Sequence, residues 1–324
     1  NVPANEFMNL EGDKMSTSRN WKLEMEDYIN DFIKPENGGS QLADTLRYYL
    51  TAIAPESKDS EFTWKGFQDA NNSELVSIFG NFINRALVLM HKLCKGKVPP
   101  LHADVMDVMD EMDHATIAEI KQTKEKVEKL LEEYKFRDAQ FEVINLARIG
   151  NQYMQKKEPW IIAKTTDDSG KPTSNAQKSI DNCMHLCLQL TANLAILIHP
   201  FLPGTAKKML GMMKVVDKIL DWENAGKIKL LSTGYSLREP QLLFRKIEDA
   251  EINVQVEKLK NGLIKQAVTN NTTKMEENKL IIEPEKQIEP SPNIQEQPIE
   301  KITSTKIDSL IENTSPKSEQ ILNE

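Results

Sequence analysis

The segment that most clearly indicates the fold class is Leu186-Cys-Leu-Gln-Leu-Thr-Ala-Asn-Leu-Ala-Ile-Leu-Ile198. Its apolar residues would lie on nearly every side of a helix, so we expect a helix over residues 174–198 to be covered by neighbours all round. Such an element is typical of the central helix of a bundle. The segment His199-Pro-Phe-Leu-Pro203 ends it, because proline cannot continue a helix, and a short helix is expected over residues 205–213.

Helices with one apolar face precede this central helix. Residues 74–97 carry apolar side chains at the i, i+3, i+4 and i+7 spacing of one helix face, namely Leu75, Ile78, Phe79, Phe82, Ile83, Ala86, Leu87 and Met90. Similar patterns predict helices over residues 102–133 and 138–157. Residues 62–222 are therefore expected to form a helical bundle.

The two ends of the chain have a different character. Near the N-terminus we expect a short strand over residues 6–10, a polar loop over 11–21 and a helix over 40–54 capped by Ser40. No aromatic residue follows Phe244, and the composition of residues 251–324 predicts a disordered tail. Within this tail Ile252, Val256, Leu259 and Leu263 have the spacing of a short helix over 252–266, to which we assign no function.

Composition excludes several classes of protein. The 324 residues could form about two domains. Lys and Arg number 41 against 49 Asp and Glu, a net charge of -8, which excludes a globally basic nucleic-acid binder but not a local RNA site. Three cysteines fit a reducing cytoplasm, and neither a membrane span nor a cleavable signal is expected. The first residue, Asn1, suggests that the sequence begins inside a longer product.

Two groups of residues resemble metal ligands, but we interpret them otherwise. On a helix Cys183 and Cys187 share a face while His185 points elsewhere, so the three cannot converge on one ion, and buried thiols are expected. The second group lies near the start of a helix, where the helix dipole stabilises negative charge, and we expect it on a solvated face. It consists of Asp104, Asp107, Asp110, Glu111 and Asp113. No metal site is predicted.

The loop Gly12-Asp-Lys14-Met-Ser16-Thr-Ser18-Arg19-Asn20 could carry chemistry. It offers an ammonium, a guanidinium, three hydroxyls and backbone N–H groups, which together could bind a polyphosphate. Taken alone, a short polar loop is more often simply solvated.

Other motifs in the chain favour the phosphate interpretation. Lys14-Met-Ser-Thr-Ser18 resembles the Lys-Met-Ser-Lys-Ser signature of class I aminoacyl-tRNA synthetases. Three later segments are similar to methionyl-tRNA synthetases: Ala43-Asp-Thr-Leu-Arg-Tyr-Tyr-Leu50; Phe62-Thr-Trp-Lys-Gly-Phe67 leading to Asn81-Phe-Ile-Asn-Arg85; and Lys157-Glu-Pro-Trp160. The resemblance covers residues 1–245.

The resemblance implies an enzyme that activates methionine with ATP and Mg²⁺ to methionyl-adenylate, and then transfers the methionyl group to tRNA(Met). It implies catalytic roles for Lys14, Ser16 and Ser18, with Lys14 and Thr17 binding ATP. Thr17 stands where many relatives have a second lysine, so Lys14 or Arg19 must compensate or activation is slower.

The resemblance also implies anticodon recognition by three residues, Asn81, Arg85 and Trp160. Asn81 and Arg85 are four residues apart, so a helix places them on the same side, where an amide and a guanidinium can read base edges. Pro159 ends or bends the preceding helix and would present the Trp160 indole for stacking on a base. Trp64 and Trp222 are interpreted as packing residues.

The expected architecture is mainly α. Residues 1–60 form the C-terminal end of a Rossmann-type catalytic domain with the signature loop, residues 61–250 a helical anticodon-binding domain, and residues 251–324 the disordered tail. None of the five histidines begins the His-x-Gly-His motif of the family, so we expect a cytoplasmic chain that is inactive without an N-terminal half that binds methionine and ATP.

Other interpretations stay open. The main alternative is a non-catalytic helical RNA-binding or scaffolding protein. Another class I specificity is also conceivable, but it would not explain the Asn81, Arg85 and Trp160 set. A C-terminal tRNA-binding domain or a dimer partner could belong to the longer protein.

Overall fold

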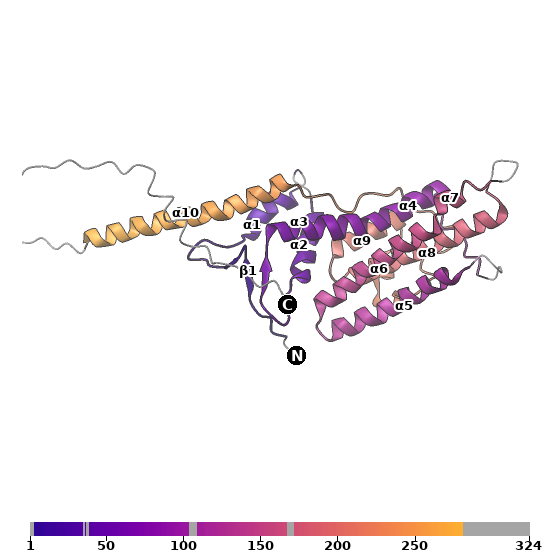
Figure 1. Cartoon of the computed structure of the whole chain (residues 1–324), viewed down its shortest axis with the longest axis horizontal. Coiled ribbons are helices and arrows are strands. Elements are labelled where there is room, and N and C mark those ends of the chain that lie inside the picture. The colour runs from indigo at the N-terminus through magenta and orange to yellow at the C-terminus, as the bar shows by residue number, and fades with distance from the viewer. Residues whose placement is uncertain (1–2, 35, 37–38, 104–108, 167–171, 281–324) are drawn as a thin grey trace, which may run out of the picture. The chain divides into compact units, whose positions relative to one another are not determined.

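The structure is a computed structural model that describes residues 3–34, 36, 39–103, 109–166 and 172–280 (Figure 1). It divides into two compact units, residues 1–273 and 274–324, and of the second only residues 274–280 are described. The described residues are mainly helical, which confirms the predicted fold class. None of the described helices is both long and apolar enough to cross a membrane.

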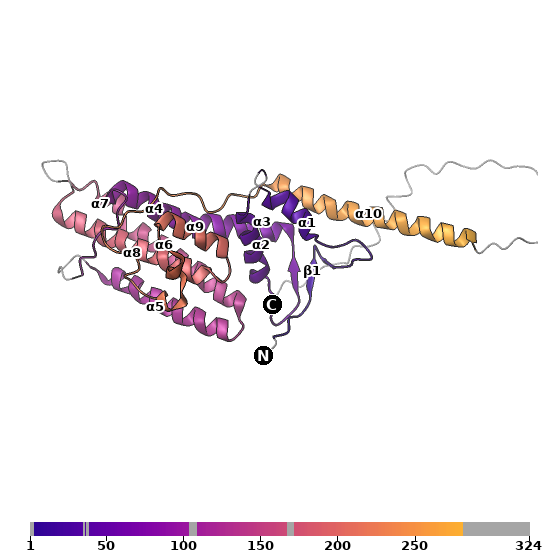
Figure 2. The same ribbon diagram turned by 180° about the vertical axis from the view of Figure 1, so that it is seen from behind.

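Four long helices form the bundle: α4 (Asn81–Cys94), α5 (Glu111–Glu132), α6 (Phe136–Lys157) and α8 (Ser174–Ile198). Helix α8 has the predicted bounds, and every residue from Asn182 to Ile198 is buried. Figures 1 and 2 show it running through the bundle, between α4 and α6 on one side and the shorter α9 (Pro203–Met213) on the other. The prediction of a central helix is therefore confirmed.

The polar side chains of α8 are buried but hold the chain that follows the bundle. Gln189 Oε1 accepts from the backbone N–H groups of Leu230 and Leu231 at 2.8 and 3.1 Å, and Asn193 Nδ2 donates to the Lys227 carbonyl at 2.8 Å. These bonds satisfy the buried amides. They fix the irregular segment after the short helices η3 (Asp217–Leu220) and η4 (Trp222–Asn224) against the centre of the bundle.

Other helix starts differ from the prediction. The expected helix over 74–97 begins earlier, as α3 (Trp64–Asp69) and the π-helical η2 (Ala70–Gly80), which leads directly into α4. The expected helix over 102–133 begins later, as α5. Asp110 caps α5: its carboxylate accepts from the backbone N–H groups of Met112 and Asp113, which defines a start that periodicity alone does not reveal.

The approach of α6 to α4 depends on a glycine. A Cβ added to Gly150 of α6 would lie 2.6 Å from the ring of Phe82, which is fully buried on α4. We expect Gly150→Ala to lower the free energy of unfolding by about 1–3 kcal/mol, because the ring must leave its packed position. Urea unfolding measures this loss, with Gly211→Ala as the matched control, since a Cβ there meets no atom within 4 Å. Equal stability of the two variants would contradict the prediction.

The N-terminal part has its own buried cluster. A three-stranded sheet has the order β2-β1-β3, in which β1 (Met8–Leu10) pairs antiparallel with β2 (Asp13–Lys14) and parallel with β3 (Ser60–Phe62). Helices α1 (Met25–Tyr28), η1 (Ile29–Ile33) and α2 (Gln41–Ala52) pack with it. Seven aromatic side chains fill the cluster: Trp21, Tyr28, Phe32, Tyr49, Phe62, Trp64 and Phe67. Ser40 does precede α2, but its side chain makes no capping bond.

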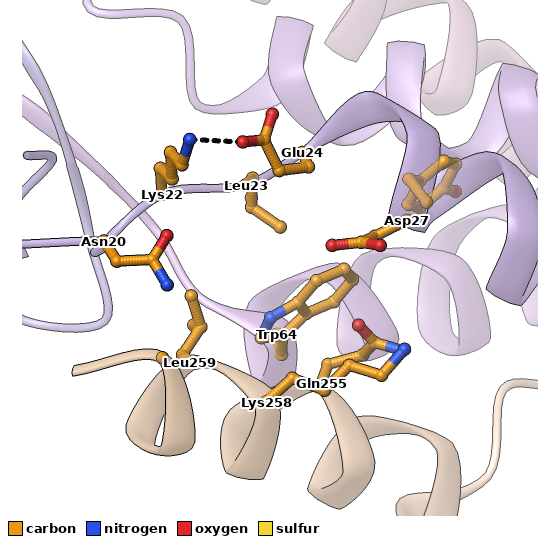
Figure 3. A pocket seen from close by; sticks show the side chains of 11 residues that line it. Asn20, Lys22, Leu23, Glu24, Asp27, Trp64, Gln255, Lys258 and Leu259 are labelled. Carbon is orange, nitrogen blue, oxygen red and sulfur yellow. Dashed lines mark ion pairs between the residues drawn. The ribbon is translucent and has the colours of Figure 1, made fainter. Parts of the chain in front are cut away.

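The last helix, α10 (Asp249–Leu280), differs from the disordered tail expected from residue 251. Ile252 and Leu259 are buried in the N-terminal cluster, and Lys258 and Gln255 donate to the Asp31 carboxylate. Figure 3 shows Leu259, Lys258 and Gln255 of α10 beside Trp64 and the segment that follows the signature loop. The beginning of the predicted tail is therefore a docked helix. Residues 281–324 lie outside the described residues.

Candidate functional sites

The signature loop, residues 12–20, is a hairpin extension of the small sheet. Asn9 pairs with Lys14 across the turn, and Ser16 pairs with Trp21 further along. The turn needs left-handed backbone at Glu11 (φ 45°) and Gly12 (φ 82°), which glycine adopts readily. The Trp21 indole is buried and donates to the Leu10 carbonyl at 2.8 Å, so the end of the loop is anchored while the loop itself is exposed.

The two cations of the loop have different environments. Arg19 pairs with the Asp13 carboxylate at 2.7 Å and also donates to the Lys14 carbonyl at 3.0 Å. Its hydrogen bond lowers the pKa of Asp13. The Lys14 ammonium lies 5.5 Å from the centroid of the exposed Phe7 ring, and no ion pair of Lys14 occurs among the described residues. Lys14 is therefore the more available cation of the loop.

The hydroxyls of the loop lie close together. Ser16 Oγ is 3.1 Å from Ser18 Oγ and accepts from the backbone N–H of Arg19 at 3.3 Å. Thr17 is exposed at the tip, and its carbonyl accepts from Asn20. A hollow of about 430 Å³ opens beside Lys14 and Met15, lined also by Phe7 and Asp59. The loop thus presents one unpaired ammonium and a group of hydroxyls to solvent, a chemistry suited to phosphate oxygens.

A second hollow lies on the bundle, between η2, α4 and α6. It has a volume of about 420 Å³, and we call it the amide groove because half of its polar lining residues are carboxamides. It is lined by Ser77, Ile78, Asn81, Arg85, Arg148, Asn151, Gln152, Gln155 and Lys156. The lining includes three cations and no carboxylate. In a chain of net charge -8, this local excess of positive charge favours an anionic ligand.

Asn81 and Arg85 line this groove, and Trp160 lies beside it in contact with Arg85. Asn81 Nδ2 donates to Asn151 Oδ1 at 3.1 Å, and Arg85 Nη2 donates to Gln155 Oε1 at 3.4 Å. The Arg85 guanidinium lies over the Trp160 ring, 5.3 Å from its centroid. Asn151 and Gln155 have the same spacing on α6 as Asn81 and Arg85 have on α4, so two amide-bearing helix faces meet.

Trp160 owes its place to the break between α6 and α7 (Pro159–Ile162). Glu158 is left-handed (φ 43°), which ends α6 and turns the chain, and Pro159 begins the next helix. Trp160 is half-buried against the bundle core, with its ring under Arg85. The indole thus has a fixed orientation at the groove, a prerequisite for stacking on a base at low entropic cost.

In the acidic group at the start of α5, Glu111 is exposed as the sequence predicts, but Asp113 is not on a solvated face. Asp113 is fully buried and accepts from the Tyr153 hydroxyl at 2.6 Å and from the Lys157 ammonium at 2.9 Å. Lys157 also pairs with Asp110 at 3.0 Å. Asp104 and Asp107 lie outside the described residues. This buried ion pair joins the start of α5 to the last turn of α6, two residues before Pro159.

The remaining candidate residues are structural. Cys183 and Cys187 are buried, and His185 is held by a hydrogen bond between Nδ1 and the Pro99 carbonyl, 2.8 Å apart. No group of three or more metal-binding side chains occurs in the described part of the chain. Trp64 is buried in the N-terminal cluster, and Trp222 donates to Glu128 at 2.9 Å. Sequence reasoning missed Asn151 and Gln155, whose amides appear on α6 at helical spacing without any motif.

Known proteins match both parts of the chain. Residues 106–262 match the family described as the anticodon binding domain of methionyl tRNA ligase, and residues 1–87 match class I tRNA synthetases (M). Methionine–tRNA ligases of Phocaeicola vulgatus and Parabacteroides distasonis are 48% and 49% identical over 259 residues, which is 80% of this chain. The chain spans about 35% of the length of these relatives.

Solved structures show the same fold. A Mycobacterium tuberculosis methionyl-tRNA synthetase in complex with methionyl-adenylate matches with a TM-score of 0.63 and 20% identity, over 74% of this chain and 43% of that one. The free form of the same synthetase matches with a TM-score of 0.61 and 17% identity, over 76% of this chain and 43% of that one.

Proposed function

The chain belongs to the methionyl-tRNA synthetase family, and on that premise we propose that it is the portion of a methionine–tRNA ligase that contacts ATP and reads the anticodon. Its partners would be tRNA(Met) and, through an N-terminal catalytic half, methionine and ATP. We place the protein in the cytoplasm, where tRNA is charged. The observation that carries the proposal is that Asn81 and Arg85 line a groove without carboxylates and that Trp160 lies against Arg85 beside it.

In the first step of the proposed reaction, the methionine carboxylate attacks the α-phosphorus of ATP and pyrophosphate leaves. Negative charge moves onto the leaving phosphates, and Lys14 would neutralise it while Ser16, Thr17 and Ser18 donate hydrogen bonds. Arg19 is committed to Asp13, so it does not replace the lysine absent at position 17 unless that pair breaks. Mg²⁺ would arrive bound to the ATP phosphates.

Anticodon recognition would use the amide groove. The Asn81 amide has both a donor and an acceptor, and the Arg85 guanidinium has several donors, so together they can pair with the edge of an unstacked base. The Trp160 ring would stack on that base. In the free structure Asn151 and Gln155 hold the same polar groups in place, and RNA would exchange those bonds for bonds to the base.

The test is tRNA binding. Trp160→Ala should weaken binding of tRNA(Met) about 5- to 150-fold, the equivalent of the ~1–3 kcal/mol that base–aromatic stacking contributes. Filter binding or fluorescence anisotropy measures the dissociation constant. A tRNA with another anticodon should bind the variant and the parent chain alike. The matched control is Trp222→Ala, which removes the indole bonded to Glu128 and should leave tRNA(Met) binding unchanged.

Two outcomes would count against the proposed role of Trp160. Equal losses for tRNA(Met) and for the other tRNA would mean that Trp160 supports the bundle rather than the anticodon. An unchanged dissociation constant for tRNA(Met) would mean that the indole does not contact RNA.

A further inference from the structure

Phe141 is the more exposed of two exposed aromatic residues on α6. It is 55% exposed, whereas the aromatic residues Phe79 and Phe82 of the same bundle are fully buried. The guanidinium of Arg148 lies over its ring, 6.0 Å from the centroid. An exposed aromatic ring beside a cation repeats the arrangement of Trp160 and Arg85, at another point of the bundle surface.

The Phe141–Arg148 pair is continuous with the amide groove. Arg148 itself lines the groove, and it is held by a hydrogen bond from Nη1 to Asn145 Oδ1 at 3.1 Å. Phe141, Arg148 and Gln155 follow one another at intervals of seven residues on α6. Each interval is about 10 Å along the helix with little rotation, so the three lie along one face.

Charge along this face favours RNA over a protein partner. No ion pair of Arg85, Arg148 or Lys156 occurs among the described residues, although acidic residues outnumber basic ones in the chain. Of the carboxylates near Phe141 on α6, Glu142 is largely buried and paired with Lys126 at 2.6 Å, while the more exposed Asp138 lies 3.7 Å from Arg137. A strip with unpaired cations, amides and an exposed ring matches what single-stranded nucleic acids bind, since phosphates meet the cations while bases stack.

We propose that Phe141 and Arg148 form a second RNA contact, in which Phe141 stacks on a loop base flanking the anticodon triplet and Arg148 contacts the adjoining phosphate. The contact rests on the proposed function of the groove but goes beyond it, because the triplet itself would occupy Asn81, Arg85 and Trp160. It would fix the path of the loop and extend recognition to a base outside the triplet.

The experiment uses the full chain and RNA hairpins that carry the methionine anticodon. Three hairpins are compared: the intact one, one without the base on the 5′ side of the triplet, and one without the base on the 3′ side. For the parent chain, we expect one of the two deletions to weaken binding about 5- to 50-fold. The Phe141→Ala variant should bind the intact hairpin as weakly as the parent chain binds the hairpin that lacks this base. For the variant, deleting this base should not weaken binding further.

Phe136→Ala is the matched control. Phe136 is an exposed aromatic residue of the same helix, 39% exposed, but it lies about 140° around the helix from Phe141 and packs edge-to-face against Tyr134. The Phe136→Ala variant should bind all three hairpins as the parent chain does. Arg148→Gln should reduce the slope of log affinity against log salt by about 0.7, as expected for one lost phosphate contact on a single strand.

The outcomes separate this contact from the function on which it rests. If Phe141→Ala binds the intact hairpin like the parent, or if its loss is the same for the intact and both deleted hairpins, the second contact is refuted. If Trp160→Ala also binds the intact hairpin unchanged, then the groove does not bind the anticodon, and the proposed function fails as well.

Discussion

Lys157→Met should lower the free energy of unfolding by about 3–5 kcal/mol, the loss expected when one partner of a buried ion pair is removed. The carboxylate of Asp113 is fully buried and would lose the ammonium that now lies 2.9 Å away. The Tyr153 hydroxyl and the backbone N–H of Asp110 would remain as its donors, and neither carries a charge. Urea denaturation at neutral pH measures the loss.

A second substitution should restore part of the stability that Lys157→Met loses. In the Lys157→Met background, Asp113→Asn removes the uncompensated charge while keeping an amide oxygen for Tyr153, so the double variant should be more stable than Lys157→Met alone. Lys129→Met is the matched control, because Lys129 is exposed and 3.9 Å from Glu133, a pair that contributes little. A double variant no more stable than Lys157→Met would contradict the account of a stranded buried charge.

The second carboxylate paired with Lys157, on Asp110, predicts that the effect of Lys157→Met on stability depends on pH. Although partial burial opposes it, the hydrogen bonds from Lys157 and from the backbone lower the pKa of Asp110 below its usual value of 3.8. A carboxyl whose pKa is lowered by folding contributes stability above its usual pKa, and the contribution is lost as the pH falls through the lowered value. The stability difference between the parent and Lys157→Met should therefore shrink below about pH 4. A constant difference from pH 7 to pH 3 would contradict it.

The bounds of a helix could be predicted from the sequence where the pattern of its own apolar residues defines it. The bounds of α8 were predicted because its apolar residues extend all round and prolines end it. The start of α5 was not predicted, because it depends on which of several nearby acidic residues accepts the first N–H groups. The docked part of α10 has two buried apolar residues, Ile252 and Leu259, so its composition resembles that of a disordered tail.

Sequence predicted which site residues lie together only where those residues belong to the same helix. The four-residue spacing of Asn81 and Arg85 places them on one side of a helix, and the structure agrees. Their partners Asn151 and Gln155 lie 70 residues away, and no local pattern connects them. The burial of Asp113 is similar, since its charge is compensated by Lys157, which lies 44 residues further along the chain. Such pairs depend on how α6 packs against α4 and α5.

Lys14→Ala should reduce methionyl-adenylate formation about 10²- to 10³-fold, the loss expected when one group that stabilises developing charge is removed. The chain for this measurement joins residues 1–280 to the catalytic half of a relative such as the Phocaeicola vulgatus methionine–tRNA ligase. Pyrophosphate exchange measures the first step. Binding of tRNA(Met) should not change, because Lys14 belongs to the signature loop and the amide groove belongs to the bundle.

Companion variants assign the loss to a particular cation. Arg19→Gln should have a smaller effect than Lys14→Ala, because the guanidinium is already paired with Asp13 at 2.7 Å, and Lys22→Ala should have none, because its ammonium pairs with Glu24 outside the loop. Thr17→Lys should raise the rate, since it adds a second charge at the exposed tip. An unchanged rate in Lys14→Ala would refute the phosphate role of the loop. If tRNA binding were retained in that case, the evidence would favour a non-catalytic RNA-binding protein built on the same bundle.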